Sequence, residues 1–171
     1  GLVSFVPGGL AGALDPTFDG DGKVTTNFSD DYDGARALVV QPDGKLVVAG
    51  TTHNGSNSNF ALVRYNPDGS LHASFGSGGW VTTDFFGVLD EARALVVQPD
   101  GRLVAAGSAN YPGGYQDFAL ARYNPDGSLD TSFDGDGMLT TDFREWREGN
   151  AGPHGRRARW PAAPGNTHNG S

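Results

Sequence analysis

The feature that most constrains this chain is its internal repetition. Residues 14–70 return nearly letter for letter at 71–128, and a third copy begins at 129–143. Repeats that start at residues 14, 71 and 129 have a period of 57 to 58 residues, and such a fixed period is typical of tandem architectures. Each copy is then one supersecondary unit that buries its apolar surface against its neighbours. We therefore divide the chain into a lead-in, two full repeats, the start of a third repeat and an aberrant tail: 1–13, 14–70, 71–128, 129–143 and 144–171.

Each repeat contains four short runs rich in Val, Thr, Leu and aromatic residues, bounded by Gly, Pro, Asp or Asn. In the first repeat these predicted strands are 22–28, 35–41, 45–52 and 60–66. Pro-Asp-Gly follows two of the runs in each repeat. Pro presets φ at the first corner of a turn and Gly accepts the left-handed position. The sequence therefore predicts consecutive antiparallel strands with turns at 42–44, 67–69, 99–101 and 125–127.

The alternation of side chains in the fourth run indicates how these units pack. Phe60, Leu62 and Arg64 share one face, and Ala61, Val63 and Tyr65 share the other. Neither face is wholly polar, so each unit needs a neighbour on both sides. Four-stranded antiparallel sheets that pack face to face are the blades of a β-propeller, which closes as a ring of about four to eight blades. We predict an all-β fold, an incomplete propeller ring of about two to three blades.

Three motifs carry a resemblance to a known family: L-D-x-[TS]-F-[DG]-x-D-G at residues 14 and 129, A-R-A-L-x-x-Q-P-D-G-[KR]-L-V-x-A-G, and F-A-L-x-R-Y-N-P-D-G-S-L. The chain resembles the delta-60 repeat family of bacterial, often exported, propeller-like proteins over residues 14–143. The resemblance implies a β-propeller fold and brings no catalytic residues with it. Because two repeats and a fraction cannot close a ring, the remaining blades of the same array are the first partners that we expect.

Charge and composition narrow the remaining partners. Residues 1–143 hold 7 Lys and Arg against 18 Asp and Glu, a balance that argues against contact with a nucleic acid backbone. The chain has no cysteine, so disulfides and thiolate metal sites are excluded. We expect no membrane span, and no cofactor other than a possible calcium ion.

The two ends of the chain carry separate expectations. The uncharged lead-in finishes Ala11-Gly12-Ala13, as at a secretory cleavage site, which predicts a secreted or cell-surface bacterial protein; a disordered lead-in is the alternative. The repeat is lost after Phe143, yet Thr-His-Asn-Gly-Ser returns at 167–171 at the distance it has in the first repeat. We interpret residues 144–162 as a third repeat translated in a shifted frame; a natural basic, disordered tail is the alternative.

Candidate sites are few. Asp19, Asp21, Asp134 and Asp136 alternate with glycines, as calcium ligands do, but the middle repeat has Gly-Ser-Gly-Gly at the same place. The turn geometry accounts for these aspartates equally well. Arg36 and Arg93 recur inside the predicted strands, as do Arg64 and Arg122, and Asp33 and Asp90 lie just upstream of the first pair. We predict an ion pair within each blade, with an anion site lined by repeated arginines as the alternative.

The repeats differ mainly in the loop 51–59 and its counterpart 108–117, and variable loops on a constant scaffold commonly carry recognition. The candidate binding residues in these loops are His53, Asn54, Tyr111, Tyr115 and Gln116. The chain's histidines occupy unmatched positions, and no catalytic triad or carboxylate pair can be assembled from the spacing. The sequence favours a non-enzymatic binding or structural scaffold that contacts a polysaccharide or a cell-surface protein. The alternative is a hydrolase or lyase whose active site lies in further blades.

Overall fold

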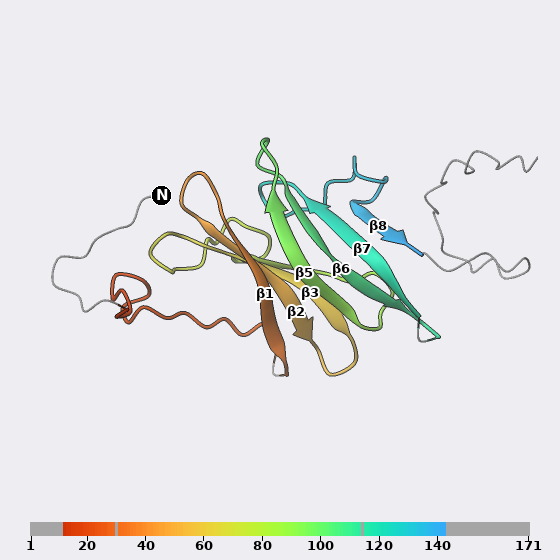
Figure 1. Ribbon diagram of the computed structural model, residues 1–171, viewed down its shortest axis with the longest axis horizontal. Helices are drawn as coiled ribbons and strands as arrows, with labels where there is room; N and C mark the ends of the chain where they lie inside the picture. Colours follow the sequence, from red (N-terminus) through yellow and green to blue (C-terminus); the bar gives the residue numbers. More distant parts are fainter. Residues whose placement is uncertain (1–11, 30, 114, 143–171) are drawn as a thin grey trace, which may run out of the picture.

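The computed structural model describes residues 12–29, 31–113 and 115–142. Within them eight strands form two four-stranded antiparallel sheets with strands in sequential order. The first sheet contains β1 (Asp33–Val40), β2 (Leu46–His53), β3 (Ser58–Tyr65) and β4 (Trp80–Thr83). The second sheet contains β5 (Asp90–Val97), β6 (Leu103–Tyr111), β7 (Tyr115–Tyr123) and β8 (Met138–Thr141). The fold is all-β, as predicted, and the two sheets are adjacent blades of a β-propeller (Figure 1).

The frame-shift interpretation of 144–162 and nearly all of the predicted signal segment concern residues outside the described part of the chain. The described residues contain no helix that is long and apolar enough to span a membrane.

All four predicted Pro-Asp-Gly turns are present. In the first, the Gln41 amide donates to the Lys45 carbonyl at 2.8 Å and the Gly44 amide donates to the Gln41 carbonyl at 2.9 Å. Gly44 has a φ of 83°, a value that glycine adopts without the steric cost that a β-carbon adds. The same turn joins β5 and β6. This geometry explains why both repeats have Pro-Asp-Gly at the turn.

The prediction of a strand at 22–28 is wrong. This segment forms no strand, whereas its counterpart Trp80–Thr83 is the fourth strand of the first sheet and pairs with β3 from Phe60 to Val63. In the same way β8, which comes from the third repeat, completes the second sheet. Each blade is therefore offset from the sequence repeat, taking three strands from one repeat and its outer strand from the next.

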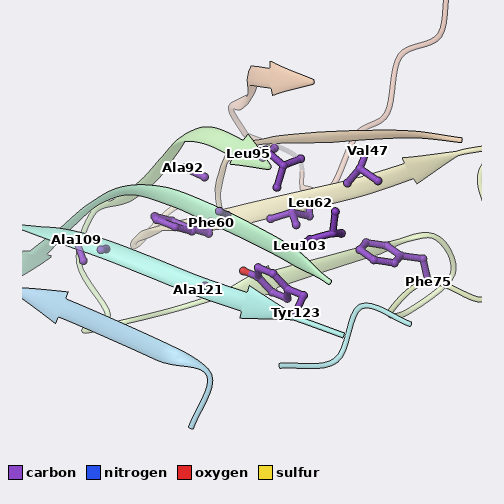
Figure 2. Close-up of a cluster of buried hydrophobic side chains, with 13 residues drawn as sticks. Val47, Phe60, Leu62, Phe75, Ala92, Leu95, Leu103, Ala109, Ala121 and Tyr123 are labelled. Carbon is purple, nitrogen blue, oxygen red and sulfur yellow. The ribbon is translucent and has the colours of Figure 1, made fainter. Parts of the chain in front are cut away.

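The apolar core lies between the two sheets, where β5 lies against β1, β2 and β3 (Figure 1). Figure 2 shows side chains of the first sheet, such as Phe60 and Leu62, gathered with Leu103 and Tyr123 of the second. All four of these side chains are buried. The alternation noted in the fourth run is thus confirmed, because Phe60 and Leu62 share the face that packs on the second sheet.

Polar contacts fix the same joint between the blades. The Thr83 hydroxyl lies 2.8 Å from the buried Tyr123 hydroxyl. The Arg64 guanidinium donates to the carbonyl of Pro125 at 2.6 Å and stacks over the Phe75 ring, 4.5 Å from its centroid. A buried cation needs such partners. The Arg64 side chain therefore stabilises the contact between the blades and does not serve as an anion ligand.

Candidate functional site

The variable loops gather at one end of the two sheets because antiparallel strands reverse direction at each turn. We call this the loop end and define it as residues 27–29, 31–32, 53–58, 84–89, 111–113 and 115–116. The connection 84–89 lies between the two hairpins. The Ser58 amide donates to the Val88 carbonyl at 2.8 Å, and the Asn110 amide donates to the Leu89 carbonyl at 3.0 Å. The loop end is therefore held together by backbone bonds to both blades.

The structure places the five predicted binding residues at the loop end but in two separate groups. In the first blade, His53 Nδ1 lies 2.7 Å from a carboxylate oxygen of Asp31, and the Asn54 side chain accepts two amides of its own turn. Both side chains are therefore engaged in hydrogen bonds within the first blade's own loops. The hairpin that contains His53 and Asn54 is polar and is stabilised by these hydrogen bonds.

The second group extends the ladder of the second blade. Tyr111 and Tyr115 face each other as the last pair of β6 and β7. The Gln116 amide donates to Asn110 at 3.1 Å. Tyr115 is more than half exposed. The hairpin 111–115 thus presents aromatic surface on a rigid two-stranded base.

An aromatic cleft opens beside this hairpin. It is lined by Phe85, Phe86, Tyr111 and Pro112 and has a volume of about 340 Å³. The rings of Phe86 and Tyr111 meet edge to face, with centroids 5.4 Å apart, and Phe85 contacts the buried Phe60 in the same manner at 5.0 Å. Edge-to-face contacts hold rings in fixed orientations. The rings of the aromatic cleft are therefore held in place, and Phe85 connects them to the apolar core through Phe60.

Two of the rings that line this cleft are particular to the second repeat. Where it has Phe86 and Tyr111, the first repeat has Ser29 and Asn54. Sequence reasoning singled out Tyr111 but missed both phenylalanines, which lie outside the compared loops. A letter-by-letter comparison of 27–32 with 84–89 would have found the change from Ser29 to Phe86.

Asp90 anchors the connection that carries the phenylalanines. One of its carboxylate oxygens accepts the Phe85 amide at 2.7 Å, and the other oxygen has no hydrogen-bond partner among the described residues. Burial raises the pKa of Asp90 to about 6, because desolvation penalises the charged carboxylate. Asp33 makes the equivalent bond to the Phe28 amide at 2.8 Å. These aspartates are loop anchors.

The prediction of an ion pair within the blade is right for Arg93 and Arg122, which bind Glu91 and Asp130 of their own blade. The partners suggested by the spacing are wrong, because Asp33 does not bind Arg36 and Asp90 does not bind Arg93. Both arginines bind Glu91 instead, Arg36 from the neighbouring blade with a nitrogen to oxygen distance of 2.9 Å. The reason is a bulge at each arginine, which shifts the register of β1 and β5 there and re-aims the side chain. The Arg–Glu–Arg cluster joins the blades at their closest strands.

A second cleft, of about 600 Å³, lies at the opposite end, between the loop that contains Ser77 and the turn that contains Asp126. Several of its polar groups are already engaged in bonds between neighbouring segments. The Gly76 amide donates to the Asp126 carbonyl at 2.7 Å, and the Ser128 hydroxyl donates to the Asp126 carboxylate at 2.7 Å. This cleft is part of the joint between the blades.

The four calcium candidates occupy turns. Asp19 and Asp134 have positive φ values of 49° and 51°, while Asp21 and Asp136 accept the amides two residues ahead. In the described part of the chain, no three His, Cys, Asp or Glu side chains gather as metal ligands would. The turn geometry by itself explains the residue types.

The fold and the offset strands define the class of protein, a β-propeller built from tandem repeats, of which the described residues form two blades. Residues 41–75 and 98–133 match the family model described as a domain of unknown function (DUF5122) beta-propeller. The chain is thus similar to a propeller-repeat family. No curated protein matches it.

Proposed function

We propose that this chain is part of an exported, non-enzymatic binding scaffold of the delta-60 repeat type, and that its aromatic cleft binds a neutral polysaccharide. The observation that carries the proposal is the contrast between the two blades. Their strands and turns are nearly identical, whereas Phe86 and Tyr111 of the aromatic cleft correspond to Ser29 and Asn54 in the first repeat. Differences on a constant frame are where recognition resides.

The chemistry of the cleft favours a sugar. The flat, apolar face of a pyranose ring packs on an aromatic ring, and the hydroxyls at its rim remain in water or bind polar groups such as Gln116. Aromatic side chains give large contact area at low cost in conformational entropy. The loop end contains no Lys or Arg, so it is unsuited to anionic polysaccharides.

Affinity gel electrophoresis with laminarin, dextran and the anionic polymer alginate tests this proposal. We expect retardation by at least one neutral polymer and none by alginate. Phe86→Ser, which installs the residue of the first repeat, should weaken binding by about tenfold or more, since 1.4 kcal/mol corresponds to a tenfold change. Tyr32→Ala removes an exposed aromatic residue of the same loop end and should leave retardation unchanged.

Two results would contradict the proposal. Retardation that is equal for the native chain and Phe86→Ser would remove the cleft from the binding site. Absence of binding to every polymer would favour a cell-surface protein as the ligand. The alternative function, a hydrolase or lyase completed by further blades, predicts release of reducing ends from the bound polymer, whereas a scaffold releases none.

A further inference from the structure

The outward faces of the two sheets repeat the chemistry of the joint between them. Leu38 and Leu95 are equivalent residues, yet Leu38 is 56% exposed and Leu95 is 7% exposed, because the first sheet covers only the latter. Likewise Phe60 is fully buried and its equivalent Phe118 is 67% exposed. We call the outward faces of the two sheets their open faces. That of the first sheet is exposed around Leu38, whereas its Ala61, Val63 and Tyr65 are buried within the single chain, and that of the second sheet is exposed around Phe118.

These two open faces are copies of the two faces that already fit together. The open face of the second sheet has Ala94, Val96, Val104, Ala106, Phe118 and Leu120 where the covered face of the first has Ala37, Val39, Val47, Ala49, Phe60 and Leu62. The open face of the first sheet keeps Ala35, Leu38, Leu46 and Tyr65 of the other partner. Its main changes are Val48 and Val63 in place of two alanines, and both replacements are apolar.

The N-terminal segment 12–28 extends the pattern. The Asp19 amide donates to the Asp68 carbonyl at 2.7 Å, as the Gly76 amide does to the Asp126 carbonyl. The Thr26 hydroxyl lies 2.6 Å from the Tyr65 hydroxyl, as Thr83 lies beside Tyr123. The segment therefore lies against the first sheet as residues 71–85 lie against the second.

Residues 71–85 include β4, the outer strand of the preceding blade. Residues 23–28 thus stand where the outer strand of another blade belongs, although no other strand of that blade is present among the described residues. A backbone segment held in this position is suited to strand addition, in which an edge pairs with a sheet from another molecule.

We propose that copies of this chain associate head to tail. The open face of the second sheet of one copy packs on the open face of the first sheet of the next, and residues 23–28 of the second copy pair with β7 in place of β8. The interface is heterologous, so repeated association gives either a closed ring or a filament. Each copy contributes the two blades that its described residues form, so a ring of about four to eight blades contains about two to four copies.

The exchange of outer strands costs little because the two segments are nearly the same. Lys-Val-Thr-Thr-Asn-Phe at 23–28 replaces Met-Leu-Thr-Thr-Asp-Phe at 138–143, and the ladder to β7 keeps its backbone bonds. The gain is the apolar surface around Leu38 and Phe118, which is removed from water on association. Exchange of identical or similar elements is a low-cost route to assembly.

Light scattering after size-exclusion chromatography tests the proposal on the full chain. We expect a mass of two to four copies that falls toward one copy on dilution. Leu38→Asp places a charge on the open face of the first sheet, and Phe118→Asp places one on the open face of the second sheet. Each variant alone should therefore be monomeric. Leu89→Asp, which places the same charge at a comparably exposed position of the loop end, should keep the native mass.

Mixing the two monomeric variants gives the sharpest result. Each retains one intact face, and the two intact faces are complementary, so the mixture should form a one-to-one heterodimer that grows no further. A native chain that is monomeric at all concentrations would overturn the proposal. A dimer that survives in Leu38→Asp alone would overturn the head-to-tail arrangement. Both outcomes are independent of polysaccharide binding, since no residue of the aromatic cleft is changed.

Discussion

Truncation of equivalent phenylalanines in the two blades should have very different effects on stability. Phe60 is fully buried between the sheets, and Phe118 is 67% exposed. Phe60→Ala removes a packed ring from the core, a change that costs about 3–5 kcal/mol. Phe118→Ala loses only the buried third of a side chain whose full burial contributes about 1.5–3 kcal/mol, so its cost is about 1 kcal/mol. The expected difference is therefore about 3 kcal/mol.

The comparison is made in the Leu38→Asp background, in which Phe118 stays uncovered by a neighbouring copy. Thermal unfolding followed by circular dichroism should show Phe60→Ala melting about 6–12 °C below Phe118→Ala, since 1 kcal/mol shifts the melting temperature of a chain of this size by about 2–4 °C. Urea midpoints should rank the two variants in the same order. Equal shifts would refute the reasoning, because they would mean that both rings have the same surroundings.

Three further predictions follow from local geometry. Asp90 has a folded-state pKa of about 6, which is above its unfolded value. Protonation of Asp90 therefore favours the folded state most below pH 4, and this contribution to stability is lost as the pH rises through 6. Asp90→Asn should flatten that part of the profile of urea midpoint against pH. Gly107→Ala should destabilise the chain by more than about 2 kcal/mol, measured by urea unfolding, because a β-carbon there would lie 1.9 Å from the Glu91 carbonyl oxygen. Millimolar calcium should shift the melting temperature by less than about 1 °C, since each of the two Asp-Gly-Asp-Gly loops offers two carboxylates and calcium takes about six to eight oxygens; a rise of several degrees would show binding.

Much of the fold could be predicted from the sequence because its signals are local. Pro-Asp-Gly sets a turn wherever it occurs, and the alternation around Phe60 assigns faces to a strand without knowledge of its neighbours. The position of the outer strand could not be predicted in the same way. A run such as 22–28 can pair with the strands that follow it or with those that precede it, and the repeat period is identical in both cases.

The site was less predictable because its contacts join residues from different repeats. Asp33 and Arg36 are close in sequence, but the bulge sends Arg36 to Glu91 of the next blade. The aromatic cleft combines Phe86, after the fourth strand of one sheet, with Tyr111 in a hairpin of the other. Comparison of aligned loops could identify Tyr111, whereas the ring that it contacts became evident only from the packing of the two blades.

The central claim is that recognition resides in the variable loops and that the repeated frame serves to hold them. A loop graft tests it most directly: residues 111–115 are replaced by Asn-Gly-Ser-Asn from 54–57, which gives the second blade the hairpin of the first. The account predicts a melting temperature within about 3 °C of the native chain, because the graft changes only the last pair of β6 and β7 and the turn between them. It predicts loss of neutral polysaccharide binding by about tenfold or more. Full retention of binding in a folded graft would contradict it.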